Sequence, residues 1–210
     1  MYSTVVFLGV SIGFIVAFAT KPCPTPVPCP TLAPTPAPTP APTPAPVSSY
    51  GTVQLFDSGS SSVGNSDDST LIGYCTGNTP GGFSCDVTYF VRSNSTLDLA
   101  DYPTALGFNP SAAVEGEVAT IAPSWTDLIA GSLTNSLNTA MGTTITPYTG
   151  TTTSGTVSAA TCVDWTSDFG LDSRTIGDGS ATTTAWMSSS TADCSAPLPG
   201  AAKWLCICLS

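Results

Sequence analysis

The sequence predicts an α+β domain that is rich in strands, contains little helix and is stapled by disulfides. From residue 48 onward, short hydrophobic runs alternate with segments of Ser, Thr, Gly and Asp, which is typical of strands joined by turns. Most of the 8 cysteines lie in this region. Cysteines in a chain with so few charged residues favour an extracytosolic protein with disulfides. We therefore expect one domain over residues 48–210, preceded by two segments that form no core.

Residues 1–20 form a hydrophobic segment that must enter a membrane during synthesis. The apolar run Val5–Ala19 would reach roughly 30 Å as a helix, which is long enough to cross a bilayer as an uncleaved anchor. Ala17-Phe18-Ala19 has the small-x-small form of a signal-peptidase site, and cleavage there would leave Thr20 as the first residue. Both fates stay open, and the membrane is an expected partner through this segment.

Residues 21–47 form a Pro/Thr-rich stalk. Proline occupies every second or third position from Pro22 to Pro46, so polyproline II is the only regular conformation available. At about 3.1 Å per residue the stalk would hold the following domain up to ~75 Å from the membrane. Its threonines are candidate acceptors of O-linked sugar. Cys23 and Cys29 are expected to form a local or interchain disulfide, with a free or lipidated thiol as the alternative.

Within residues 48–210, four hydrophobic runs predict strands: Thr52–Phe56, Val87–Val91, Val118–Ile121 and Trp204–Leu209. The segment Ser124–Leu137 carries apolar residues at near-helical spacing behind a possible N-cap at Ser124, although Gly131 interrupts it. The polar stretch Thr143–Ala159 is long for a loop in a compact domain. It is either functional or held in place by disulfides.

Charge and composition exclude several classes of function. With 4 basic and 14 acidic residues the formal charge is −10, so nucleic acid and anionic lipid are unexpected partners. The chain has no histidine, which removes His-based triads, Cys/His dyads and the usual His-containing zinc sites. We therefore expect a protein that is not an enzyme and that holds no cofactor.

The six cysteines of the domain allow fifteen pairings; they are Cys75, Cys85, Cys162, Cys194, Cys206 and Cys208. Cys206 and Cys208 lie two apart in a predicted strand, so they point to the same face and each needs a distant partner. Spacing alone does not choose among the remaining pairings.

The order of cysteines and tryptophans resembles the C-terminal half of the C-type-lectin-like fold. The residues that carry the resemblance are Cys162-Val163-Asp164-Trp165, Trp186, Cys194 and Trp204-Leu205-Cys206. With Ser124-Trp125-Thr126-Asp127-Leu128 and Gly131-Ser132-Leu133 added, the chain is similar to a lectin-like domain of unknown function in secreted and lipoprotein-type bacterial proteins. The resemblance covers Val118–Leu209 and extends to Val53–Cys75.

The resemblance implies a disulfide pattern. Cys162, on a strand, would pair with Cys194 in the loop packed over it, and Cys75 would pair with Cys206 of the closing strand. Cys85 and Cys208 then remain as an extra pair.

The resemblance also implies a function: a non-enzymatic, membrane- or envelope-tethered module for adhesion, recognition or structural attachment, with a protein or glycan surface as partner. Pro-Ala and Pro-Thr stalks joined to lectin-like domains resemble surface or minor capsid proteins of large DNA viruses of algae. That likeness implies a virion location and assembly into a larger shell. The alternatives are a soluble carbohydrate binder released by cleavage and a secreted aspartic peptidase.

Calcium-dependent sugar binding has little support in the sequence. Sugar-binding members of the family use Glu-Pro-Asn or Gln-Pro-Asp and Trp-Asn-Asp motifs, whereas this chain has Trp186-Met187-Ser188 at the second position. Four acidic residues offer other calcium ligands, but a solvated surface is the favoured interpretation: Asp164, Asp168, Asp172 and Asp178. Trp165 and Trp186 are candidates for stacking on a ligand, with a core role favoured.

Two further motifs have a chemical interpretation. Leu55–Ser61 resembles the Asp-Ser/Thr-Gly turn of aspartic peptidases, in which two aspartates share a proton. Since the chain has one such motif, catalysis by Asp57 would need a homodimer; the alternative is a strand that ends in a Ser/Gly turn. Asn94-Ser95-Thr96 is a glycosylation sequon, usable in a eukaryotic secretory lumen.

Overall fold

The structure, a computed structural model, describes residues 50–59, 67–167, 169–195 and 202–210. These residues belong to one unit, Ala45–Ser210. The predicted hydrophobic segment 1–20 and the stalk 21–47 lie outside them. None of the helices formed by the described residues is long and apolar enough to cross a bilayer.

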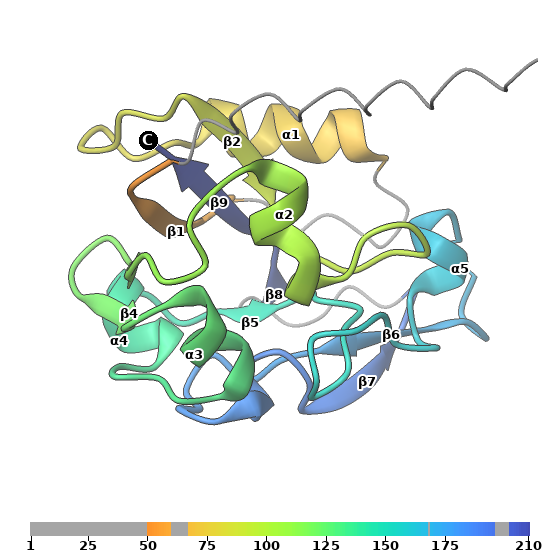
Figure 1. Ribbon diagram of the computed structural model, residues 1–210. Coiled ribbons are helices and arrows are strands. Elements are labelled where there is room, and N and C mark those ends of the chain that lie inside the picture. The colour runs from red at the N-terminus through yellow and green to blue at the C-terminus, as the bar shows by residue number, and fades with distance from the viewer. Residues whose placement is uncertain (1–49, 60–66, 168, 196–201) are drawn as a thin grey trace, which may run out of the picture. The chain divides into compact units, whose positions relative to one another are not determined.

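A five-stranded sheet joins the start and the end of the described chain (Figure 1). Its order is β2-β9-β1-β3-β4, formed by Val87–Phe90, Leu205–Leu209, Val53–Asp57, Val114–Glu115 and Thr120–Ala122. β1 runs antiparallel to β9 along its whole length and parallel to β3. Three predicted strands are confirmed as β1, β2 and β9. The strand expected at Val118 begins at Thr120, because the preceding residues turn from β3 into β4.

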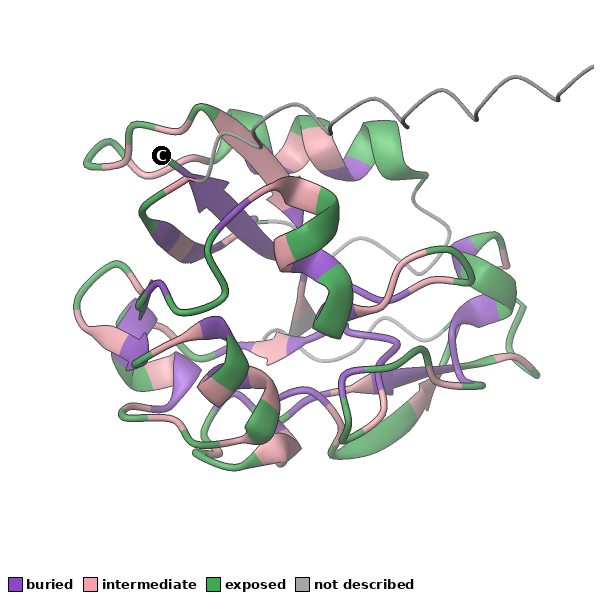
Figure 2. Ribbon diagram, viewed as in Figure 1, coloured by how far each residue is buried: buried purple, intermediate pink, exposed green. Residues whose placement is uncertain are grey.

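β9 is buried on both faces, as Figure 2 shows along its length. Leu205, Ile207 and Leu209 pack into the larger hydrophobic core. Cys206 and Cys208 point the other way, into a second cluster that also holds Trp204. The period-two alternation of a strand therefore divides a continuous apolar run between two cores.

Three disulfides fix the domain, and they join the pairs that the lectin resemblance implies: Cys75–Cys206, Cys85–Cys208 and Cys162–Cys194. The first two attach α1 and the segment after it to β9. The expected placement of the third pair is wrong in one respect, because Cys162 lies on a left-handed turn, α5 (Cys162–Trp165), whose four residues all have positive φ, rather than on a strand. Thr161 forms an isolated antiparallel β-bridge with Arg174. The chain then turns, and Trp165 packs in the second cluster.

The longest described helix, α1 (Asp68–Gly77), was not expected from the sequence. Asp67 caps its first turn by accepting a hydrogen bond from Thr70 N at 2.7 Å. Only Leu71 and Cys75 of this helix are buried. Because it is rich in Ser, Thr and Gly, the segment shows no helical pattern of apolar residues in the sequence. The disulfide from Cys75 to β9 stabilises the helix, which the helix propensity of these residues does not.

The helix expected at Ser124–Leu137 is two separate helices, α3 (Trp125–Ala130) and α4 (Leu137–Met141). Gly131 ends α3 in the left-handed region, with φ of 74°. A Cβ at this glycine would lie 2.2 Å from Thr184 N, so only glycine fits the turn. The sequence placed the start of α3 correctly, with Ser124 as N-cap, and its end seven residues too late.

Short elements complete the fold. They are η1 (Leu99–Asp101), α2 (Tyr102–Leu106), η2 (Thr184–Trp186), the parallel pair β5 (Thr146–Pro147) and β8 (Ala202–Lys203), and the antiparallel pair β6 (Ser173–Ile176) and β7 (Ser190–Asp193).

Buried threonines fix the polar stretch 143–159. Thr151 Oγ1 donates to Thr149 O at 2.8 Å and lies 3.1 Å from Ser93 Oγ, and Thr149 Oγ1 donates to Met187 O. These hydroxyls satisfy the polar groups that a buried loop would otherwise leave unpaired. Hydrogen bonds therefore hold this stretch in place, where the sequence analysis had considered disulfides.

Two buried arginines stabilise the second cluster. The Arg92 guanidinium lies over the rings of Phe90, Trp165 and Trp204 at 4.7, 4.8 and 5.3 Å, and it pairs with Asp68 of α1 at 2.5 Å. Burial lowers the pKa of Arg92, and the charge of Asp68 opposes this shift. Arg174 lies over the Tyr148 ring in the same way, at 4.4 Å. Both cations therefore serve packing.

Replacing Ser124 with alanine is expected to lower the free energy of unfolding by about 1 kcal/mol, because α3 loses its N-cap. Ser124 Oγ accepts from Asp127 N at 2.9 Å and donates to Asp127 Oδ2 at 2.6 Å. Urea unfolding measures the effect, and Ser111→Ala, at an exposed loop position, is the control. A loss equal to that of the control would contradict the capping role.

Candidate functional site

A pocket of about 370 Å³ opens between α2, α3, η2 and the loop that precedes α5. Six apolar residues and four hydroxyl-bearing residues line it: Ala100, Pro103, Pro110, Trp125, Ile129 and Ala130, with Thr126, Thr153, Ser154 and Thr184. No charged side chain belongs to this lining.

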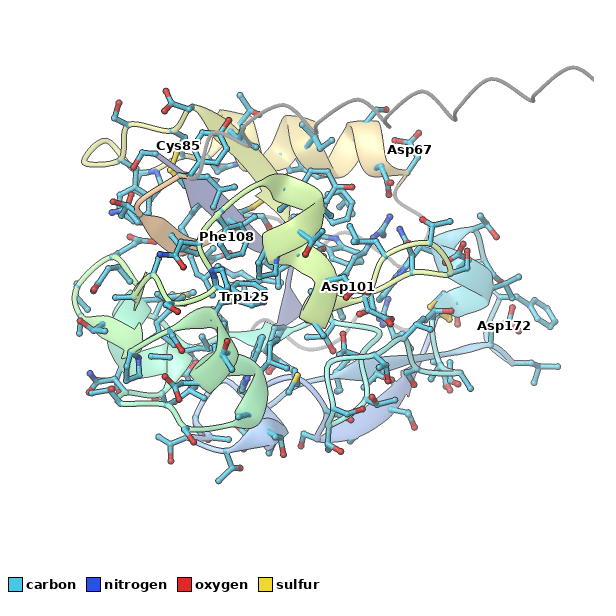
Figure 3. The ribbon with its side chains drawn as sticks, viewed as in Figure 1. Asp67, Cys85, Asp101, Phe108, Trp125 and Asp172 are labelled. Atoms are coloured by element: carbon cyan, nitrogen blue, oxygen red, sulfur yellow. A yellow bond between two sulfur atoms is a disulfide. The ribbon has the colours of Figure 1, made fainter. Side chains whose placement is uncertain are left out.

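Trp125, the first residue of α3, is the fixed part of the wall. Its ring stacks on Tyr102 with centroids 5.8 Å apart and meets the edge of Phe108 at 5.3 Å. Its Nε1 donates to Leu99 O at 3.0 Å. Figure 3 shows Trp125 beside Phe108. The indole is only 1% exposed, so a ligand in the pocket could contact the edge of the ring but could not stack on its face.

The loop 151–157 closes the opposite side. Gly155 has φ of 81°, and a Cβ there would lie 2.7 Å from Ile129 Cγ2, so glycine lets this loop approach α3. Three hydroxyls hold the turn: Thr152 Oγ1 lies 2.9 Å from Ser154 Oγ and 2.7 Å from Thr156 Oγ1. Thr153 and Ser154 thus stand at the rim on a braced turn.

The polar chemistry of the pocket lining is that of its hydroxyl groups. Its lining holds no carboxylate, amine or thiol that could act as acid, base or nucleophile. An apolar floor with hydroxyls at the rim matches an uncharged ligand that combines apolar faces with hydrogen-bonding groups.

The structure buries both tryptophans considered for ligand stacking. Trp165 is 2% exposed and Trp186 is fully buried. Their Nε1 atoms donate at 2.8 Å to Ser93 O and Leu128 O, respectively. Neither indole offers a face to a ligand from solvent, which agrees with the core interpretation that the sequence favoured.

Asp57 ends β1 beside a lysine. Its Oδ1 accepts from Gly59 N at 2.8 Å, and its Oδ2 lies 2.5 Å from Lys203 Nζ. The third acidic or basic residue nearby is Glu117, which the charge of Asp57 influences. Burial and the charge of Asp57 raise the pKa of Glu117. The single Asp-Ser-Gly turn of this chain thus sits in a Lys/Asp/Glu cluster, unlike the aspartate dyad of a peptidase.

The acidic residues considered for calcium are dispersed. Asp164 accepts from Ser95 N and Oγ at 2.8 and 2.6 Å, and Asp178 accepts from Ser180 in the same manner. Asp172 accepts from Ser167 Oγ, and Asp168 lies outside the described residues. Over residues 50–59, 67–167, 169–195 and 202–210, no three His, Cys, Asp or Glu side chains form a group that could hold a metal ion.

The sequon occupies a turn between β2 and η1. Asn94 Oδ1 accepts from Thr96 N, Thr96 Oγ1 and Leu97 N, each at 2.9 Å, and Ser95 and Thr96 are exposed. Glycosylation of Asn94 stays a prediction.

The sequence analysis covered six of the ten pocket residues, four within the helix expected at Ser124–Leu137 and two within the polar stretch Thr143–Ala159, but it did not join the two segments into one site. Five separate stretches of chain bring the ten residues together, most of them small or polar. The one local signal for the site is Gly155 in a Thr/Ser-rich turn, which marks a close approach of two segments.

Comparison of the chain with known protein families and with curated proteins found no match.

Proposed function

We propose that the domain is a non-enzymatic recognition module that binds an uncharged, hydroxyl-rich ligand, such as a neutral glycan, in the pocket beside α3. The observation that carries the proposal is the composition of that pocket, which has apolar walls, four hydroxyls and no charged group. In the wider proposal this lectin-like module is tethered by residues 1–20 through the stalk to a membrane or envelope, including that of a virion, and mediates adhesion or attachment.

The charge of the chain favours a neutral ligand over an acidic one. A formal charge of −10 repels sulfated, phosphorylated or sialylated groups as they approach. The pocket itself offers no cation that would offset this repulsion. Neutral hexoses and their derivatives meet both conditions, because their ring C–H faces are apolar and their edges carry hydroxyls.

Binding in this pocket is expected to need no metal ion, because its lining offers no carboxylate ligand. This distinguishes the proposal from the calcium-dependent sugar binding of many lectins. The three disulfides are compatible with the extracytosolic location that such a module requires.

The test is a screen of neutral and acidic glycans with the full-length protein, followed by titration of the best neutral one. Thr153→Trp, at the exposed rim, fills the pocket and is expected to weaken that binding at least about tenfold, equivalent to 1.4 kcal/mol. Thr191→Trp, on the exposed strand β7, is the matched control and should bind as the parent does.

Chelation with EDTA should leave the affinity unchanged. Binding that is equally weakened by both tryptophan variants, or a screen in which no neutral glycan binds, would overturn the proposal. The soluble carbohydrate binder differs only in the fate of residues 1–20. N-terminal sequencing separates the two, because Thr20 as first residue identifies the released form.

A further inference from the structure

The described chain enters the domain beside the wall of the pocket. Tyr50, the first described residue, forms a parallel β-bridge with Phe108, and its N–H donates to Gly107 O at 3.3 Å. The rings of Phe108 and Trp125 have centroids 5.3 Å apart, and the two residues lie together in Figure 3. Pro110, two residues after Phe108, lines the pocket itself. The sequence that precedes Tyr50 is therefore the first place to look for a ligand.

That sequence ends in a repeat whose chemistry matches the pocket. Residues 33–46 repeat Ala-Pro-Thr-Pro and carry no charge, so the net charge of −10 does not repel them. Polyproline II has three residues per turn, so positions i and i+3 lie on the same face. Since proline fills every second position, each face of the repeat alternates a proline ring with an Ala methyl group or a Thr side chain. Every face thus combines apolar and hydroxyl groups.

The lining of the pocket complements such a segment. Proline rings and methyl groups can pack against its apolar residues, which besides Trp125 are Ala100, Pro103, Pro110, Ile129 and Ala130. A polyproline II backbone makes no internal hydrogen bonds, and proline has no N–H, so the segment presents mainly carbonyl acceptors. The hydroxyls of the lining are donors for these acceptors, and they belong to Thr126, Thr153, Ser154 and Thr184.

We propose that this pocket binds residues 33–46 of a second copy of the chain. The inference rests on the proposed function in using the same pocket, and it names a protein partner for that site. Three residues separate Pro46 from Tyr50, so a semi-rigid segment would have to reverse within residues 47–49 to reach the pocket of its own domain. The segment of a neighbouring copy needs no such reversal.

Two properties of the repeat favour this contact. Polyproline II is ordered before it binds, so little conformational entropy is lost on binding. Ala-Pro-Thr-Pro occurs three times in succession, which gives one pocket several equivalent registers. Tethering of copies to one membrane, as the proposed function has it, raises their effective concentration for one another.

The contact would be heterologous, because the segment of one copy meets the pocket of the next. Heterologous contacts extend into rings or rows of copies rather than ending at a pair. A neutral glycan that enters the pocket would displace the neighbouring segment, so ligand binding and association of copies would oppose each other.

The first test is a titration of a fluorescent peptide, with the sequence of residues 33–46, by the full-length protein in neutral detergent. Its anisotropy should rise to saturation with the parent and with Thr191→Trp, on the exposed strand β7. Thr153→Trp, which fills the pocket, should bind at least about tenfold more weakly. The mirror-image peptide of D-amino acids has the same composition and the opposite helical hand, so it should also lose at least about tenfold.

The second test identifies the source of the segment. Full-length copies that carry a donor or an acceptor dye at the C-terminus are mixed in excess neutral detergent. Energy transfer between them should fall when unlabelled peptide is added and in Thr153→Trp, but not in Thr191→Trp. Energy transfer that neither change lowers would overturn association through a second copy.

Three results of the titration would overturn binding of the segment: no binding to the parent, equal binding of both mirror forms, or equal binding to Thr153→Trp. The glycan screen separates this inference from the proposed function. A protein that binds a neutral glycan in the pocket but not the peptide would refute the inference alone. Peptide binding without any glycan binding would refute the glycan proposal alone.

Discussion

Replacing Gly150 with alanine is expected to lower the free energy of unfolding by about 3 kcal/mol, from left-handed backbone strain together with overpacking. Gly150 has φ of 58°, and a Cβ at this position would lie 2.4 Å from Trp165 Cζ2 and 3.0 Å from Ser93 O. The indole cannot easily retreat, because its Nε1 donates to Ser93 O at 2.8 Å and the guanidinium of Arg92 lies over its ring. Urea unfolding monitored by tryptophan fluorescence measures the loss.

Gly73→Ala is the matched control for this substitution. Gly73 lies within α1, and a Cβ there meets nothing within 4 Å. Since alanine is the better helix former, the control should gain about 0.5–1 kcal/mol. The same chemical change is thus expected to act with opposite sign at the two positions. A Gly150→Ala protein as stable as its parent would contradict the packing of Gly150 against Trp165.

Removing both disulfides to β9 is expected to leave the chain unfolded. The bonds close overlapping loops of 131 and 123 residues, so the second bond adds only a short ring once the first is in place. In the loop model either pair replaced by alanine costs about 3 kcal/mol, and both pairs together cost about 8 kcal/mol, comparable with the whole stability of a domain. Circular dichroism and urea unfolding of the two double variants and the quadruple variant measure these losses.

The third disulfide provides the comparison. Cys162–Cys194 closes a loop of 32 residues that neither of the other bonds shortens, so its removal is expected to cost about 4 kcal/mol. The bond with the shortest loop should therefore matter slightly more than either of the longer ones alone. If removal of each long-loop bond instead lowered the free energy of unfolding by the full amount that its own loop length predicts, the two overlapping loops would be acting independently.

The sequence predicted the elements whose signal is local. β1, β2 and β9 are short apolar runs bounded by polar turns. The same-face argument placed Cys206 and Cys208 together, and the structure turns that face toward the second cluster. α1 escaped detection because its Ser, Thr and Gly residues leave only Leu71 and Cys75 buried. The end of α3 was missed because a glycine inside an apolar pattern does not reveal that another segment, at Thr184, packs against it.

The two candidate sites depend on tertiary structure and could not be read from the sequence. Ala100, Pro110, Thr153 and Thr184 are common surface residues, and only the fold places them around one pocket. Lys203 and Asp57 share no sequence motif. The sequence analysis considered Asp57 because of the Ser and Gly that follow it, and not because of its lysine partner. The tryptophans show the converse, because the core role of Trp165 and Trp186 followed from the lectin resemblance before any contact was known.

The position of β1 determines how the domain would respond to mechanical tension. β1 is the first strand of the described chain, so a pull on the preceding polypeptide first loads the backbone bonds of Tyr50 to Gly107 and of Thr52 to Ser210. It then reaches Val53, which pairs with Leu209 at the opposite end of β9 from Asp57. Such a pull would peel β1 from its neighbours one hydrogen bond after another. Rupture would spread toward Asp57, where the ion pair with Lys203 adds to the last hydrogen bonds of the β1–β9 ladder, so the load is highest at the far end of the strand.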